Sequence, residues 1–476
     1  MTMLIRVLPC ATQFIDHLDQ ALRQASHAQR LTMKQRYFLA FVISAMILTQ
    51  KLCWATMERR SLGQYTSAAL WWMFYRSEIV WHLLLRISVL VIIDRYGLSE
   101  GNLLIDDTGR SRSKRTKKIG KTHKIKEKKT NGYINGQELV FLVLQTPLVT
   151  VPVDFRFYMP DPEMTEWRKT RDLLKKQGIP PKDRPPKPKP NSEYPTKQLL
   201  ALDMIQAYQR HFPNINVTGI LADALYGDAN FMDRASSVFS GIQVVSQLRW
   251  NQLVIYKNKE VKLKAYFDSY LGPGVKKTLV IRGGKEQKVT VLSARLKVKA
   301  HGQKRFIVAL KYEGEDDYRY LAATDVSWRH DDIARLHTLR WLIEVFFEDW
   351  KLHEGWCNRA LQQGIEGSER GVILSVLCDH MLLLHPEQSA RLEHKQPALT
   401  VGCLVEKLRI DALLDIIKIV VESENPQEKL KKLTESLEDY RPLRISSKHM
   451  AGRELGRMMP TASLKYRLPE YQTLVH

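Results

Sequence analysis

The chain has 476 residues, of which 44% are hydrophobic and 26% charged, a balance that excludes a disordered, collagen-like or small disulfide-rich protein. At about 100–200 residues per domain, this length predicts two to four structural units. The 73 basic and 51 acidic residues give a net charge of +22, which indicates a polyanionic partner, with nucleic acid as the first candidate.

The cysteines and the apolar stretches exclude further classes. The five cysteines are odd in number and none form a C-x-x-C pair, which argues against a disulfide framework, a zinc ribbon or a thioredoxin-type motif and fits a reducing cytosol. We expect no signal peptide, because Met1–Cys10 has no long apolar run before a cleavage site. The apolar stretch Tyr37–Leu48 is shorter than the about 20 residues of a membrane-spanning helix, and it predicts a core helix.

Residues 1–100 are predicted to form an all-α N-terminal domain. Leu31–Cys53 and Ala68–Ile93 are rich in Leu, Ile, Phe, Trp and Met, with few Gly or Pro residues. These helices could contact DNA or simply form a packed bundle, and the pattern is not specific for a helix-turn-helix.

The pattern changes at Leu103, where a short apolar run ends in Asp106 and Asp107. Arg110–Lys129 follows, with eleven Lys or Arg residues and a single acid. Leu139–Gln145 and Val149–Tyr158 are rich in strand-forming residues, so the region predicts a three-stranded meander with a basic first connection.

Pro160–Pro195 contains nine prolines and is predicted to be a loop or linker without regular helix. The next segments alternate in type: a helix over Thr196–Phe212, a strand over Val217–Ala222 that ends at Asp223, a helix over Asp228–Phe239 with Asp228 as its N-cap, and a strand over Ile242–Leu248.

Trp250–Tyr320 is again strand-like, with Gly-rich turns between the runs. Asp331–His353 predicts one strong helix, which begins with acidic residues and ends before Gly355. The chain is then mostly helical to about residue 423, and it is polar and basic from residue 440.

This order predicts a mixed α+β fold, in which an RNase H-like catalytic core is interrupted by a β-rich insertion. The predicted boundaries are a helical N-terminal domain at 1–100, the first part of the core at 101–249, the insertion at 250–330, the last core helices at 331–385, and a helical C-terminal region with a basic tail at 386–476.

Carboxylates stand where such a core could bind metal. Cleavage or transfer of a phosphodiester needs charge neutralisation and an activated nucleophile, which two Mg²⁺ ions about 3.5–4 Å apart supply through hard oxygen ligands. Asp107 ends the first strand, Asp223 ends the fourth, and Glu344 or Glu348 lies on the late helix. Taken singly, each is a weak candidate, because an Asp at a strand end is more often a turn residue or a helix N-cap than a metal ligand.

The late helix adds a pattern. At about 100° per residue, His337, Arg340, Glu344 and Lys351 fall within one polar stripe, and Glu348 lies at its apolar edge. The alternative is an ordinary solvated face with an Arg340–Glu344 ion pair. Asp349 falls on the apolar side and does not fit the pattern.

These residues resemble a known family. Arg340-x3-Glu344-x6-Lys351 is similar to the Y-x2-R-x3-E-x6-K signature of DDE transposases of bacterial insertion sequences, in the IS-four family. Asp106-Asp107-Thr108-Gly109 resembles the family's D-D-T-G block, and the basic residues downstream resemble its follow-on. Asp223-x-x-Tyr226-Gly227 resembles its D-x-x-Y-G. The resemblance covers about residues 100–360.

The resemblance implies that Asp107, Asp223 and Glu344 are catalytic and bind two Mg²⁺ ions, with Mn²⁺ able to substitute. It places Arg340 and Lys351 on phosphates of the transposon end. His337 stands where the signature has tyrosine and is expected to bind DNA there, since a histidine can still hydrogen-bond a phosphate oxygen, with a pH-dependent charge. It also implies a homodimer bound to the terminal inverted repeats and to target DNA, in a bacterial cytoplasm. We expect further DNA contacts from the basic loop: Arg112, Lys114, Arg115, Lys117 and Lys118.

Two other classes remain open, a catalytically inactive DNA-binding protein derived from a transposase and an RNase H-like nuclease that acts on RNA or hybrid duplexes. We expect Glu344, rather than Glu348, to be the third ligand, because only Glu344 has the signature spacing. Trp250 and Trp328 are interpreted as core or rim aromatics rather than as platforms for a flipped base.

Overall fold

The computed structural model describes residues 6–25, 29–113, 118–126, 132–269, 275–280, 286–354, 356 and 362–439. The chain divides into two compact units, Met1–Ile416 and Ile417–His476, and each is described by itself.

Five helices begin the first unit: α1 (Pro9–Ala25), α2 (Met33–Thr49), α3 (Trp54–Arg60), α4 (Ser67–Tyr75) and α5 (Trp81–Tyr96). Thr32 and Gln35 form a capping box that starts α2, and Gln50 ends it in the left-handed conformation. Most residues of α2 are buried, which confirms the core helix predicted over Tyr37–Leu48. Among the described residues, no single helix has the length and apolarity to cross a membrane, and only the bent pair α2–α3 meets those criteria jointly.

The first six strands are β1 (Glu100–Ser113), β2 (His123–Lys126), β3 (Tyr133–Gln145), β4 (Thr150–Tyr158), β5 (Asn216–Ala222) and β6 (Gln243–Leu248). β4, β3 and β1 pair antiparallel, whereas β1, β5 and β6 pair parallel, in the order β4-β3-β1-β5-β6. Parallel neighbours need crossovers, and helices α7 (Lys197–His211) and α8 (Ala229–Val238) supply them. Asp228 caps α8 as expected.

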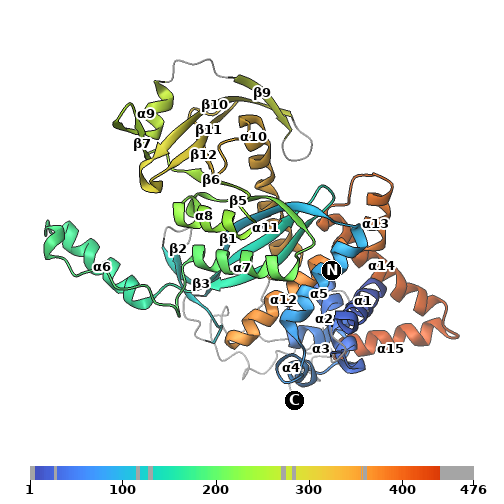
Figure 1. Cartoon of the computed structure of the whole chain (residues 1–476). Helices are drawn as coiled ribbons and strands as arrows, with labels where there is room; N and C mark the ends of the chain where they lie inside the picture. Colours follow the sequence, from blue (N-terminus) through green and yellow to red (C-terminus); the bar gives the residue numbers. More distant parts are fainter. Residues whose placement is uncertain are drawn as a thin grey trace, which may run out of the picture. The chain divides into compact units, whose positions relative to one another are not determined.

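The next part of the chain extends this sheet (Figure 1). It comprises β7 (Leu253–Tyr256), β8 (Lys259–Lys262), α9 (Leu263–Asp268), β9 (Val275–Val280), β10 (Glu286–Val298), β11 (Lys304–Tyr312) and β12 (Arg319–Ala323). β12 pairs antiparallel with β6, so backbone hydrogen bonds continue from the first strands into the inserted ones. The structure is therefore a mixed α+β fold around one large mixed sheet.

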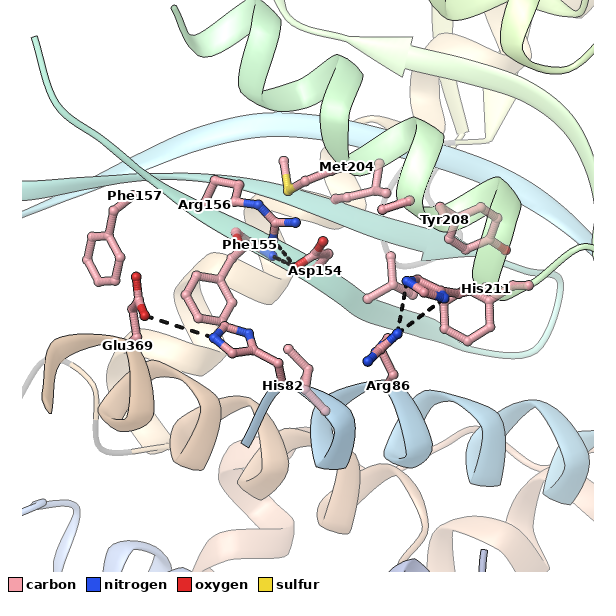
Figure 2. Close-up of a pocket in the computed structure, with 15 residues that line it drawn as sticks. His82, Arg86, Asp154, Phe155, Arg156, Phe157, Met204, Tyr208, His211 and Glu369 are labelled. Atoms are coloured by element: carbon pink, nitrogen blue, oxygen red, sulfur yellow. Dashed lines mark hydrogen bonds and ion pairs between the residues drawn. The ribbon is translucent and has the colours of Figure 1, made fainter. Parts of the chain in front are cut away.

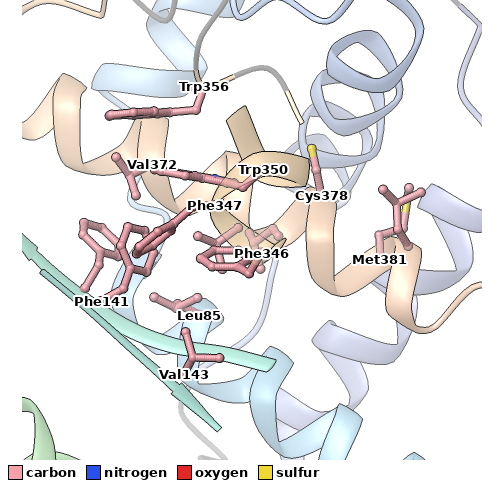
Figure 3. Packing of buried hydrophobic residues seen from close by; sticks show 14 of the residues in the cluster. Leu85, Phe141, Val143, Phe346, Phe347, Trp350, Trp356, Val372, Cys378 and Met381 are labelled. Atoms are coloured by element: carbon pink, nitrogen blue, oxygen red, sulfur yellow. The ribbon is translucent and has the colours of Figure 1, made fainter. Parts of the chain in front are cut away.

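Helices cover both faces of the sheet. One face packs against the N-terminal helices and against α10 (His330–Leu339), α11 (Trp341–His353) and α12 (Gly364–Leu383), and the other packs against α7 and α8. Aromatic rings fix α11 to β3: the ring centroids of Phe141 and Trp350 are 4.9 Å apart, and Phe346 and Phe347 also pack on Phe141 (Figure 3). The Trp350 Nε1–H donates to Ser375 on α12 at 2.8 Å. The position of α11 over the sheet is thus set by buried contacts.

The prediction that Pro160–Pro195 contains no regular helix is wrong for its first part. Helix α6 (Pro162–Lys176) begins at the N-cap Asp161, whose side chain accepts from the backbone of Glu163 and Met164. Pro162 stands in the first turn, where proline is tolerated, and the next proline is Pro180. The prolines therefore limit this helix without preventing it.

The single helix predicted over Asp331–His353 is divided at Arg340 into α10 and α11. Around the division the Arg340 N–H bonds to the carbonyl of His337, and the Ile343 N–H bonds to the carbonyl of Arg340. These are three-residue rather than four-residue spacings, so one continuous α-helical wheel does not hold across the whole segment.

Helices α13 (Pro386–Glu393) and α14 (Val401–Val421) follow, and Leu404, Val405 and Leu408 of α14 are buried. The second unit contains the end of α14 and then α15 (Pro426–Asp439), whose described residues are largely exposed. The predicted basic tail, from residue 440 on, lies outside the described residues.

Two buried carboxyl groups, Glu354 after α11 and Asp379 in α12, lie against each other, and no basic side chain among the described residues pairs with either. Burial and the neighbouring Asp379 raise the pKa of Glu354, and burial raises the pKa of Asp379 to about 7. Asp349, which did not fit the helical pattern, lies close enough to raise both pKa values further.

This pair predicts a pH-dependent stability. The folded chain keeps protons that the unfolded chain loses near pH 4, so the free energy of unfolding should fall as the pH rises from about 4 to about 7. Glu354→Gln removes the buried charge and should raise the melting temperature by several degrees at pH 8 but little at pH 5. Thermal unfolding across this range tests it, with the exposed Glu422→Gln as control. An equal effect of Glu354→Gln at both pH values would contradict it.

Candidate active site

The acidic ends of β1 and β5 lie side by side at the centre of the sheet. The parallel register pairs Ile105 with Ala222, so Asp106 and Asp223 are the next residues on neighbouring strands. Side chains alternate between the two faces of a strand. Leu104 packs in the core beneath α10–α12, whereas Leu103 and Ile105 pack in the core beneath α7 and α8. Asp106 therefore shares the α11 face, and Asp107 points to the opposite face.

Arg340 connects Asp106 to the late helix. Its guanidinium lies 3.3 Å from the Asp106 carboxylate and 2.6 Å from that of Glu344. Further along the same face of β1, the Lys351 ammonium donates to the Thr108 hydroxyl. Arg340, the N-cap of α11, and Lys351 near its end thus contact Asp106 and Thr108, two alternate positions of one strand.

The charge at this point is only partly balanced. Burial, the largest cause, and the charges of Asp223 and Asp107 together raise the pKa of the Asp106 carboxyl to about 7, against the lowering effects of the Asp107 backbone N–H and of Arg340. A carboxyl group with so high a pKa is one whose ionised form needs another cation to stabilise it. Arg340 is such a cation beside Asp106.

Asp107, the residue expected to begin the triad, is engaged on the other face. Its carboxylate lies 2.6 Å from the Lys197 ammonium at the start of α7. Lys197 also lies 3.5 Å from Glu138, which in turn pairs with His123 at 3.0 Å. The strand thus turns Asp106, and not Asp107, toward Arg340, and the catalytic role expected of Asp107 stays a prediction.

The donor set suits a hard divalent cation. Asp106, Asp223 and Glu344 offer only carboxylate oxygens, the ligands that Mg²⁺ prefers. Among the described residues, however, no three His, Cys, Asp or Glu side chains are close enough together to hold a metal ion, and the Glu344 carboxylate is paired with Arg340. The guanidinium, a cation, lies between two of these carboxylates.

The loop that carries Asp223 is tightly held. The Ser246 hydroxyl donates to the Asp223 carbonyl at 2.8 Å. Gly227 approaches β6 so closely that a Cβ atom there would lie 2.7 Å from the Gln247 carbonyl oxygen. Tyr226 is completely buried, and burial and then the charges of Asp107, Asp106 and Asp223 raise the pKa of its hydroxyl. The D-x-x-Y-G residues thus have a packing reason for their identity.

His337 does not lie where the signature tyrosine was expected to serve. It is only 7% exposed, because α10 ends before Arg340 and turns this side chain inward. Burial, the largest cause, and the charges of Arg340 and Arg319 together lower the pKa of His337 to about 3. His337 is therefore interior, which does not favour the expected phosphate contact, and that contact stays a prediction.

The remaining predicted DNA contacts differ in placement. Arg112 donates to the Gln137 side chain at 2.8 Å, and its guanidinium lies 4.6 Å from the centre of the Trp356 ring. Lys118 is exposed, whereas Lys114, Arg115 and Lys117 lie outside the described residues. Trp328 is partly buried against the core, as interpreted, but Trp250 is 58% exposed.

A pocket of about 400 Å³ lies away from these carboxylates, between α5, β4 and α7 (Figure 2). It is lined by apolar side chains and by paired polar groups, including Arg156 with Asp154 and Arg86 with His211. None of the candidate site residues lines it.

The sequence model of the family described as DDE superfamily endonuclease matches residues 28–306. The matched region contains Asp106, Asp107 and Asp223 and ends before Glu344. No curated protein matches the chain.

Proposed function

Because the chain belongs to the DDE superfamily of endonucleases, which act on DNA, we propose that it is the transposase of a bacterial insertion sequence. In this proposal it cleaves DNA at the ends of its own element and joins them to target DNA. Asp106, Asp223 and Glu344 form the catalytic set. The observation that carries the proposal is the position of Arg340, which forms ion pairs with both Asp106 and Glu344. Asp223 follows the neighbouring strand β5, at the position next to Asp106.

The sheet supports an RNase H-like core. The order β4-β3-β1-β5-β6, antiparallel in its first three strands and parallel in its last three, brings the first and second carboxylates to adjacent strands. Helix α11 then brings the third carboxylate from more than 100 residues further along the chain. The strands β7–β12 form the insertion between the second and third carboxylates.

Asp106, Asp223 and Glu344 would hold Mg²⁺, or Mn²⁺ in its place. When bound, two such ions supply an activated nucleophile and stabilise the charge that develops on the phosphate. Arg340 has five N–H donors, so it can keep a carboxylate in place and donate to a phosphate oxygen as well. Lys351 adds a second positive charge next to Thr108. These two cations would orient the scissile phosphate toward the carboxylates.

The two alternatives differ in their products. An inactive DNA-binding derivative would bind element ends without cutting them, and an RNase H-like nuclease would cut without joining. The adjacent acids Asp106 and Asp223, of which Asp106 is largely buried, speak against the first, since DNA binding alone gains nothing from acidic groups that repel phosphate. A strand-transfer assay with Mg²⁺, a labelled element end and a target plasmid separates the three. We expect both cutting and joining; intact DNA, or cut ends that are never joined, would contradict the proposal.

The basic loop gives a separate prediction about affinity. If Lys114, Lys117 and Lys118 contact phosphates, replacing all three with Ala should flatten the slope of log affinity against log salt concentration by about two to three. Binding of an element-end duplex between 50 and 300 mM salt measures the slope. A triple variant with the slope of the wild type would mean that the loop does not contact DNA.

A further inference from the structure

A chain of hydrogen bonds connects the β-rich insertion to the loop that carries Asp223. His301 lies in the turn between β10 and β11, and its Nε2 atom is 3.1 Å from the carbonyl oxygen of Gly227. Gly227 is four residues after Asp223, in the short connection between β5 and α8. A residue of the insertion therefore contacts the backbone next to the second carboxylate.

The partners of His301 fix its tautomer. The Arg305 Nε–H donates to His301 Nδ1 at 3.1 Å, and a guanidinium can only donate, so Nδ1 carries no proton. The Gly227 carbonyl can only accept, so Nε2 must carry the proton. Burial and the Arg305 charge lower the pKa of His301, the direction that agrees with the neutral ring that these two partners require. Both ring nitrogens therefore form hydrogen bonds, and together these bonds fix the orientation of the imidazole ring.

Arg305 is itself held in place. Its side chain is 3% exposed, and it donates to Asp233 of α8 at 2.6 Å. Gln303 donates to the other Asp233 oxygen, also at 2.6 Å. The carboxylates of Asp228 and Asp233 are the acidic groups whose charge acts on His301. The network thus begins on α8, passes through the insertion and returns to the loop before α8.

We propose that His301, oriented by Arg305 and Asp233, is a positioning residue that holds the 223–228 loop and thereby the Asp223 carboxylate in place for metal binding. Two other side chains also hold the loop: the Ser246 hydroxyl donates to the Asp223 carbonyl, and the Gln198 amide donates to the Leu225 carbonyl. His301 adds a bond at the end of the loop, to the Gly227 carbonyl. The insertion would accordingly have a role in the geometry of the catalytic site besides any contact with DNA.

The role of His301 as a metal-site support rests on the proposed function, but its effect on the loop can be measured without activity. Hydrogen–deuterium exchange of metal-free protein, followed in peptides that cover residues 219–230, reports the loop directly. Calorimetric titration with Mn²⁺ reports the site. The variants are His301→Ala, which removes both bonds, and His301→Gln, whose amide can donate to Gly227 while its carbonyl oxygen accepts from Arg305. The exposed His394→Ala is the matched control.

We expect His301→Ala to exchange faster in this loop and to bind Mn²⁺ about 10-fold more weakly, the usual cost of losing a group that orients metal ligands. His301→Gln and His394→Ala should behave as the wild type. Unchanged loop exchange or unchanged Mn²⁺ affinity in His301→Ala would overturn the inference, as would a His301→Gln variant as impaired as His301→Ala. If wild-type protein neither binds Mn²⁺ nor cuts DNA, the proposed function and the metal-site role of His301 both fail. Normal Mn²⁺ binding and cutting by His301→Ala would overturn the inference alone.

Discussion

Asp106→Asn is expected to reduce metal-dependent DNA cleavage roughly 10³-fold or more, whereas Asp107→Asn should reduce it by less than about 10-fold. The difference follows from the alternation of β1, which turns Asp106 toward Arg340 and Glu344 and turns Asp107 toward Lys197. Removing the Asp106 charge removes a metal ligand. Removing the Asp107 charge removes one of two acidic partners of Lys197, and Glu138 remains as the other.

Single-turnover cleavage of an element-end duplex in Mg²⁺ measures the two rates. Binding of the same duplex in EDTA is the control, and both variants should bind it about as well as the wild type. The two substitutions are matched in chemistry and are adjacent in sequence, so a general effect on folding would affect both. A dead Asp107→Asn together with an active Asp106→Asn would restore Asp107 as the catalytic residue and contradict the assignment.

Glu344→Gln should reduce the rate of DNA cleavage as strongly as Asp106→Asn does, whereas Glu348→Gln should reduce it by at most about 100-fold. Glu344 lies in the first turn of α11, where its carboxylate meets Arg340 at 2.6 Å on the Asp106 side. Glu348 is one turn further along and is exposed. Glu344→Gln keeps the size of the side chain and removes only the charge, so its loss of activity would report metal binding.

The same cleavage assay compares the two glutamates, with melting temperatures as the control for folding. If Glu348→Gln were the inactive variant, then Glu348 would be the third ligand, and the Arg340–Glu344 contact would be an ordinary ion pair within the helix. That outcome would also remove the main support for the proposed function.

The choice between Asp106 and Asp107 shows where sequence reasoning stopped. Leu103, Leu104 and Ile105 form a continuous apolar run, as expected for a strand buried on both faces, and such a run carries no alternation to tell one face from the other. The side that each acid takes is decided by the pairing of Ile105 with Ala222 and by the helices that cover each face. One sequence feature pointed to Asp106: a leucine stands two residues before Asp106 and two residues before Asp223, at Leu104 and Leu221. In the structure both leucines pack in the same core, so the two acids share a face of the sheet.

The late helix shows a different limit. Periodicity and spacing could predict that a helix exists here and that it begins with acidic residues. They could also predict that one polar stripe carries Arg340, Glu344 and Lys351. The division at Arg340 could not be predicted, because no Pro or Gly marks it. The assumption of one continuous helix therefore placed His337 on the polar stripe, although its side chain is buried. Similarly, helix α6 was hidden among prolines that stand only at its start and beyond its end.

The most direct test of the account is a calorimetric titration of Mn²⁺ into wild-type protein, Asp106→Asn and Asp107→Asn. If Asp106, Asp223 and Glu344 form the metal site, the wild type and Asp107→Asn should bind Mn²⁺ with similar affinity, within about 10-fold, and Asp106→Asn should show no measurable binding. Equal Mn²⁺ binding by wild type and Asp106→Asn would contradict the central claim.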